Sequence, residues 1–228
     1  MNEWRCGAAL RRRTAMELLA LVVLTGLYLY LWPQRPWEVD TGLAIFALGL
    51  VVVLARDTNE RIWGRPDASV PARMRRSTVT MAQFTLPILL AFGLLGAWDA
   101  YSVRQEWRDL HGRLFALRVL PTLLLYVPWA LLQQTLFQVY LLGRLRVLVP
   151  SAPRAVRAGL NGLLYGAVHW PEWDVMAITI AGGLVWSYVY ERDRSLLPIA
   201  VSHAVLGTAY FAWVRHGHVV RPFGRILG

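Results

Sequence analysis

Long apolar blocks, each about 20 residues in length, restrict the fold of this chain more than any other feature of its sequence. A helix of that length can cross the ~30 Å hydrocarbon core of a bilayer. Apolar residues occupy 56% of the 228 positions and charged residues only 17%, which is a smaller charged share than soluble domains usually have. The pattern predicts an all-α fold, namely a polytopic membrane helix bundle.

We expect about seven transmembrane helices, one for each apolar block. The predicted spans cover residues 14–32, 39–55, 78–97, 117–142, 155–170, 174–191 and 195–214. A half-span or interfacial helix near the C-terminus would raise the count to eight and would change the side of the membrane that holds the C-terminus. The sequence contains no evident internal repeat or long linker, so residues 1–228 are predicted to form a single integral membrane domain.

The basic residues are concentrated in alternate loops. All 24 are arginines, and the formal net charge is +10. They gather at residues 5–13, 56–77 and 143–157, which the positive-inside rule places in the cytoplasm together with the N-terminus. We therefore expect a multi-pass protein of a bacterial inner or plasma membrane, with membrane lipid as a partner. Because the arginines lie between apolar blocks, the high charge does not indicate binding to nucleic acid.

Polar side chains lie within three of the predicted spans, although lipid makes such groups costly to bury. These residues are Gln133, Gln134 and Gln138 in the fourth span, His169 in the fifth and His203 in the seventh. Each span places its polar group roughly 14–18 Å from the arginine at its cytoplasmic end, given the rise of an α-helix. Since this depth is near the middle of the membrane, the groups are predicted to converge on one intramembrane pocket.

Local spacing supports a shared pocket. Gln134 and Gln138 are four residues apart and share a helix face, as do Tyr165 and His169. Small residues in the fifth and sixth spans permit close helix contacts; they are Gly159, Gly162, Gly166, Gly182 and Gly183. Each histidine, or the glutamine pair, could instead be a structural hydrogen-bonding group between helices, but a common depth in three spans favours a functional site.

The three segments together resemble the CPBP family, which contains CAAX proteases and bacteriocin-processing membrane proteins. The family motifs are E-E-x-x-x-R, then F-x-x-x-H, then H-x-x-x-N or D. The corresponding segments here begin and end at Gln133 and Gln138, at Tyr165 and His169, and at His203 and Gly207. The resemblance covers residues 117–214, and the run from Gly182 to Ala204 is especially similar to the family's approach to its last motif.

The resemblance implies a CAAX-protease-type intramembrane peptidase scaffold that acts on membrane-embedded or lipidated peptides. In active members, glutamates and histidines are thought to activate water in a glutamic-type or metal-assisted manner. The catalytic candidates carried over to this chain are Gln133, Gln134, His169 and His203, and the binding candidates are Gln138, Tyr165 and Gly207. A cofactor, if the mechanism uses one, would be a divalent metal such as zinc held by the two histidines.

Four positions depart from the family pattern. Gln133 and Gln134 replace the two glutamates, Gln138 replaces the arginine, and Gly207 replaces the final Asn or Asp. A neutral amide cannot act as a general base near pH 7 and is a poor metal ligand, and two histidines are fewer than the three protein ligands usual for catalytic zinc. An imidazole can still act as a base near neutral pH.

Three functions are consistent with these residues. The first is a peptidase that relies on His169 and His203, with the glutamines orienting water or the scissile carbonyl group. The second is a catalytically inactive relative, or pseudoenzyme, that binds a membrane peptide or a membrane protein in the same pocket. The third is a small-molecule transporter, against which the absence of an evident repeat argues.

Overall fold

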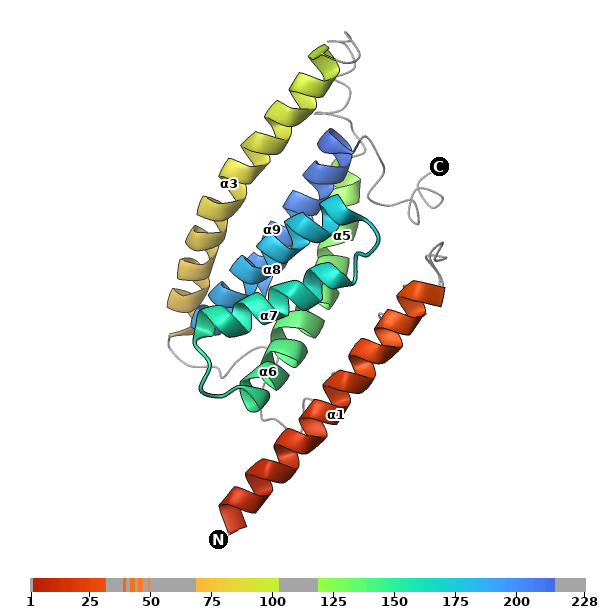
Figure 1. Ribbon diagram of the computed structural model, residues 1–228. Coiled ribbons are helices and arrows are strands. Elements are labelled where there is room, and N and C mark those ends of the chain that lie inside the picture. Colours follow the sequence, from red (N-terminus) through yellow and green to blue (C-terminus); the bar gives the residue numbers. More distant parts are fainter. Residues whose placement is uncertain are drawn as a thin grey trace. The chain divides into compact units, whose positions relative to one another are not determined.

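The computed structural model describes residues 2–31, 39, 42, 43, 45, 46, 49, 69–102 and 119–215. Within these ranges the chain is helical and contains no strand, which confirms the predicted all-α fold for this part of the protein. The labelled elements form six continuous helices (Figure 1).

Four of these helices are long and apolar enough to cross a membrane, as expected of an integral membrane protein. They are Ala8–Leu31, Val70–Ser102, Val119–Leu148 and Leu197–Val214. They correspond to the predicted spans at residues 14–32, 78–97, 117–142 and 195–214. The predicted total of seven spans is not reached among the described residues, because the helices at 155–170 and 174–191 are too short or insufficiently apolar. The predicted span at 39–55 lies outside the described residues except at six isolated positions.

The chain divides into two compact units. The first comprises Met1–Pro66 and Gln134–Arg194, and the second comprises Asp67–Gln133 and Ser195–Gly228. The boundary at Gln133 and Gln134 falls within the helical run Val119–Leu148. A single domain over residues 1–228 therefore stays a prediction, and each unit is described by itself.

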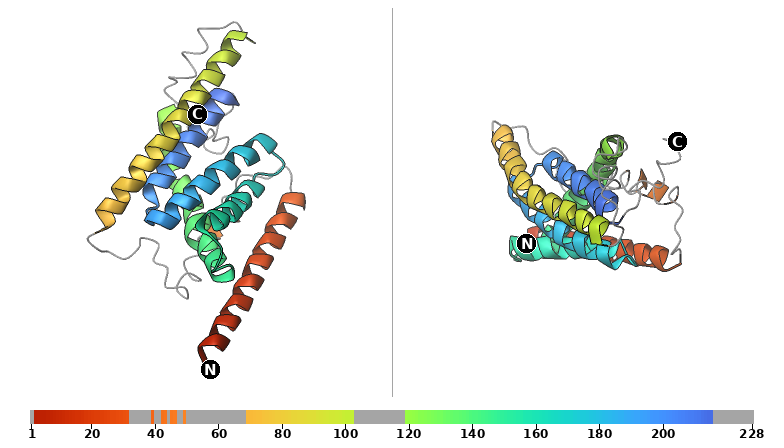
Figure 2. Two further views of the ribbon diagram at one scale, coloured as in Figure 1. Left: turned by 60° about the vertical axis from the view of Figure 1, so that its left-hand side comes forward. Right: turned by 90° about the horizontal axis from the view of Figure 1, so that it is seen from above.

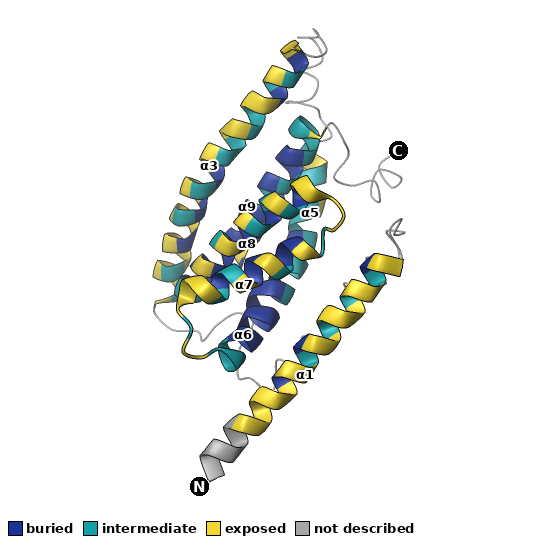
Figure 3. Cartoon of the chain, viewed as in Figure 1, coloured by how far each residue is buried: buried dark blue, intermediate teal, exposed yellow. Residues whose placement is uncertain are grey.

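The first unit is built around a short, deeply buried helical segment. Its elements are α1 (Asn2–Leu31), η2 (Thr135–Leu141), α6 (Leu142–Leu148), α7 (Arg154–Ala167) and α8 (Trp173–Asp193). Figure 3 shows α6 as mostly buried and α1 as mostly exposed. The segment η2 is a π-helix, a form that mostly occurs as single turns within α-helices and frequently lies at functional sites.

Glycines allow α7 and α8 to lie directly against each other (Figures 1 and 2). A Cβ atom added to Gly162 would lie 2.7 Å from the backbone nitrogen of Leu184, and one added to Gly183 would lie 3.0 Å from the Cα atom of Gly162. The sequence predicted that glycines in these spans permit close helix contacts, and Gly162 and Gly183 do so here. Gly159 does not take part, since a Cβ atom there would meet nothing within 4 Å.

The second unit consists of α3 (Val70–Ser102), α5 (Val119–Gln134), α9 (Leu197–Ala209) and the π-helical turn η3 (Tyr210–Val214). Helix α3 packs along α9 and η3 (Figure 2). The buried hydroxyl groups of Thr85 and Ser202 lie 2.7 Å apart and join α3 to α9 by a hydrogen bond. A Cβ atom at Gly96 would lie 2.7 Å from the carbonyl oxygen of Trp213, so glycine also permits the approach of α3 to η3.

Candidate functional site

A buried hydrogen-bond network begins at the two glutamines on either side of the start of η2. Gln134 and Gln138 have no exposed surface. The Gln138 Nε2 atom donates a hydrogen bond to the Gln134 Oε1 atom at 2.9 Å. The Gln134 Nε2 atom in turn donates to the hydroxyl group of Tyr165 at 3.5 Å. The structure therefore brings together three of the site residues that the sequence predicts.

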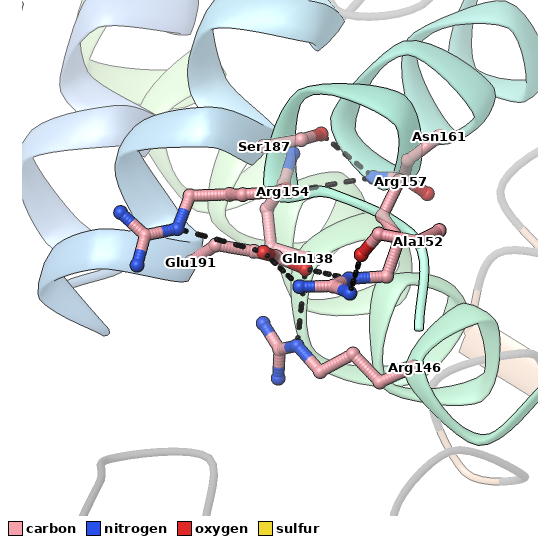
Figure 4. Close-up of polar contacts among 8 residues, drawn as sticks. All are labelled: Gln138, Arg146, Ala152, Arg154, Arg157, Asn161, Ser187 and Glu191. Atoms are coloured by element: carbon pink, nitrogen blue, oxygen red, sulfur yellow. Dashed lines mark hydrogen bonds and ion pairs between the residues drawn. The ribbon is translucent and has the colours of Figure 1, made fainter. Parts of the chain in front are cut away.

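Two further residues extend this network, and sequence reasoning missed both. The Asn161 Nδ2 atom donates to the Ser187 hydroxyl group at 2.8 Å and approaches the Gln138 Oε1 atom at 3.4 Å (Figure 4). Ser187 donates to the carbonyl oxygen of Gly183 at 2.6 Å. Asn161 lies four residues before Tyr165 on the same helix face, so its spacing could have identified it.

The network is electrically neutral and its members are fully buried. Each of its five members has no exposed surface: Gln134, Gln138, Asn161, Tyr165 and Ser187. The Asn161 Oδ1 atom is buried and has no hydrogen-bond partner among the residues that the structure describes, which leaves one acceptor available within the network. Side-chain amides of this kind can donate to and accept from a peptide group, but they cannot remove a proton as a general base.

Aromatic rings surround Tyr165, and one of them is the imidazole of His169. The His169 ring lies perpendicular to the Tyr165 ring with 6.1 Å between centroids. Phe137 and Trp186 also meet Tyr165 edge to face, at 4.3 and 5.7 Å. His169 follows the end of α7, where its backbone nitrogen donates to the carbonyl oxygen of Gly166 at 2.9 Å. The structure therefore places His169 next to the network, on the side of Tyr165.

His203 has its own polar partner, in the second unit. It lies on α9 and is 5% exposed. Its Nε2 atom is 3.4 Å from the hydroxyl group of Tyr126, and the two rings meet edge to face at 5.5 Å. A Cβ atom at Gly207 would lie 2.7 Å from the Tyr126 ring. The ring thus occupies the space beside Gly207, which gives a physical reason for glycine where the family motif has Asn or Asp.

The remaining predicted site residue is Gln133, which also belongs to the second unit. Its Oε1 atom is buried and has no hydrogen-bond partner in the described part of the chain. Gln134 and His169 fall in the first unit, whereas Gln133 and His203 fall in the second. The convergence of these four residues on one pocket therefore stays a prediction.

In the part of the chain that the structure describes, no cluster of side chains resembles a typical zinc site. Among residues 2–31, 69–102 and 119–215, no three His, Cys, Asp or Glu side chains are grouped so that they could hold a metal ion. A catalytic zinc usually has three protein ligands. The metal that the resemblance allows, held by His169 and His203, stays a prediction, because the two histidines belong to different units.

Comparison with known proteins identifies the central segment of the chain. Residues 115–209 match the family model described as type II CAAX prenyl endopeptidase Rce1-like. This range contains all seven predicted site residues and most of the predicted core at residues 117–214. Neither the curated proteins nor the solved structures include a match to the chain.

Proposed function

We propose that this chain, which carries an Rce1-like domain of the CPBP family at residues 115–209, binds a membrane-embedded or lipidated peptide on a CAAX-protease-type scaffold. Four helices suited to crossing a membrane support an integral membrane location. The observation that carries the proposal is the neutral, fully buried network of Gln134, Gln138 and Asn161.

Amide groups suit a peptide ligand in this environment. A peptide backbone that enters a water-poor site loses its hydrogen bonds to water, and an unpaired buried amide costs about 1–3 kcal/mol. Gln and Asn side chains can both donate to a peptide carbonyl oxygen and accept from a peptide N–H group. The Asn161 Oδ1 atom is such an acceptor. Replacement of the family's charged residues by amides removes general-base capacity while retaining these hydrogen bonds.

Peptide hydrolysis is a second candidate function, which the contact between His203 and Tyr126 favours. In this reaction the imidazole of His203 takes a proton from a water molecule as the water oxygen attacks the scissile carbonyl carbon. The C–N bond then breaks, and the protonated imidazole returns the proton to the leaving nitrogen. The Tyr126 hydroxyl group would orient the ring for both transfers.

The two functions can be separated with purified protein in lipid nanodiscs. Fluorescent lipidated and transmembrane peptides would be tested for binding by anisotropy and for cleavage by mass spectrometry. Binding without cleavage, weakened about tenfold or more by Gln134→Leu but not by the exposed-site variant Leu163→Ala, would support the binding function. The tenfold figure corresponds to a loss of about 1.4 kcal/mol.

Cleavage that both His169→Ala and His203→Ala abolish would instead establish a peptidase. Gln133→Glu provides an additional test, since a gain of cleavage would show that the site accepts a carboxylate as a general base. If no peptide in the panel is bound or cleaved, while circular dichroism shows that the protein is folded, both functions are contradicted for these ligand classes.

A further inference from the structure

The chain of hydrogen bonds in the glutamine network starts from a backbone carbonyl group of α8. The Ser187 Oγ atom lies 2.6 Å from the carbonyl oxygen of Gly183. Two oxygen atoms at this distance attract each other only when a proton lies between them, and a carbonyl oxygen has no proton to donate. The hydroxyl proton of Ser187 is therefore directed at Gly183, so the Oγ atom can only accept hydrogen bonds from other groups.

The direction of the following hydrogen bonds depends on this one proton. Because Ser187 can only accept, the Asn161 atom that lies 2.8 Å from its Oγ atom is the amide nitrogen (Figure 4). The same Nδ2 atom lies 3.4 Å from the Gln138 Oε1 atom, which turns the Gln138 nitrogen toward the Gln134 Oε1 atom at 2.9 Å. Gln134 donates in turn to the Tyr165 hydroxyl oxygen at 3.5 Å. The two glutamines therefore both donate toward the Tyr165 end of the network.

The direction of the chain decides what the network offers to a ligand. Rotation of one side-chain amide by itself would bring two oxygen atoms or two N–H groups against each other, so the three amides can reverse only together. The observed direction leaves the buried Asn161 Oδ1 atom as an acceptor without a partner among the described residues. In the reversed chain the Asn161 nitrogen would lie there instead, and the network would offer a donor.

We propose that Ser187 is a positioning residue that fixes this direction, and that a ligand of the network must therefore donate an N–H group to Asn161. The statement about the ligand rests on the proposed peptide-binding function, whereas the statement about Ser187 concerns the protein alone. A peptide backbone supplies such a donor where the segment is extended, because a helix uses its own N–H groups internally. The ligand class is thus a membrane peptide with an extended segment rather than a continuous helix.

The role of Ser187 can be tested without a ligand. Protein labelled with ¹⁵N in its Gln and Asn side chains would be placed in nanodiscs, and the Gln134 amide resonance would be assigned by its loss in Gln134→Leu. Ser187→Ala removes the group that fixes the direction, so the Gln134 resonance, three hydrogen bonds away along the chain, should shift or split. Ser187→Thr keeps the hydroxyl group and should restore the wild-type resonance.

Thr179→Ala is the matched control on the same helix. The Thr179 hydroxyl group is also buried and donates to the carbonyl oxygen of Val175 at 2.6 Å, but Thr179 is not a member of the network. An unchanged Gln134 resonance in Ser187→Ala would overturn the role of Ser187, and so would an equal change in Thr179→Ala. If circular dichroism shows that Ser187→Ala does not fold, Ser187→Cys replaces it, because a thiol is only a weak donor.

The donor on the ligand can be identified with a series of ester-containing peptides. Each backbone amide of a bound membrane peptide is replaced in turn by an ester, which removes one N–H group. At one position the wild-type protein should lose about five- to tenfold in affinity, and Ser187→Ala should reduce this loss to about twofold or less.

The outcomes separate this ligand assignment from the proposed function. Equal losses in wild-type protein and Ser187→Ala, or the absence of any sensitive position, would overturn the assignment while leaving peptide binding intact. If no peptide binds, the peptide-binding function fails and the ligand assignment fails with it, but the Gln134 resonance still decides the role of Ser187.

Discussion

The contact between α7 and α8 predicts that alanine has different effects on stability at two glycines of the same helix. At Gly162 a methyl group would lie 2.7 Å from the backbone nitrogen of Leu184 and 2.8 Å from the carbonyl oxygen of Ile180. Both atoms belong to the backbone of α8, so relief requires the two helices to separate. At Gly159 the same methyl group would meet nothing within 4 Å.

The expected magnitudes follow from two competing effects. Alanine is favoured over glycine within a helix by about 1 kcal/mol, and this gain applies at both positions. Overpacking of a close contact costs about 1–3 kcal/mol, and this cost applies only at Gly162. We therefore expect Gly159→Ala to stabilise the protein and Gly162→Ala to be less stable than Gly159→Ala by about 1–3 kcal/mol.

The assay is reversible unfolding of the full-length protein in mixed micelles, followed by circular dichroism as the denaturing detergent is increased. Both variants and the wild-type protein would be measured at one lipid composition, so that any binding of lipid affects all three equally. Equal stabilisation by the two substitutions would refute the close helix contact. A Gly162→Ala variant more stable than Gly159→Ala would refute it as well.

Three other substitutions test the polar contacts. Gln138→Leu should lower the free energy of unfolding by about 1–3 kcal/mol, because it removes the hydrogen bond that the Gln138 amide donates to the buried Gln134 Oε1 atom. An unchanged free energy of unfolding in a denaturing-detergent titration would contradict the network. Gly207→Ala should displace the Tyr126 ring and lower the free energy of unfolding by about 1 kcal/mol or more. The double variant with Tyr126→Leu should recover part of that loss. If it recovers none, the Tyr126 ring is not the group that the new methyl group meets. Glu191→Gln should destabilise the protein by about 2 kcal/mol, because it removes the carboxylate that Arg146, Arg154 and Arg157 share. Added salt should reduce the deficit, and a salt-independent loss would argue against an electrostatic cause.

Much of the local structure could be predicted from the sequence because it depends on short-range spacing. The apolar blocks identified four helices that are suited to crossing a membrane, and the i, i+4 spacing identified the pairing of Gln134 with Gln138 and of Tyr165 with His169. The glycines correctly indicated the close contact of α7 and α8. These features require only helical geometry and the chemistry of the side chains.

Features that depend on neighbouring helices could not be predicted in the same way. Asn161 and Ser187 come from different helices and belong to none of the three motifs, so only the packing of α7 against α8 reveals their hydrogen bond. Gly207 was interpreted as a missing side chain, yet the ring of Tyr126, which lies far away in sequence, occupies the adjacent space. The number of membrane spans could not be predicted from the apolar blocks alone. Helix α7, with 14 residues, is only about 21 Å long, which is less than the ~30 Å thickness of the hydrocarbon core.

The π-helical segment η2 is a place where this helix can absorb a change in chain length. A π-turn accommodates one residue more than an α-helical turn, so deletion of one residue from Thr135–Leu141 would convert the π-turn to an α-turn and leave the later residues facing as they do now. A deletion in a regular α-helix, by contrast, rotates every later residue by about 100°. Leu142, which is fully buried, and Arg144, which pairs with Glu17 at 3.0 Å, would keep their directions after the first kind of deletion. Single-residue deletions should therefore be tolerated better in η2 than in the α-helical turns beside it.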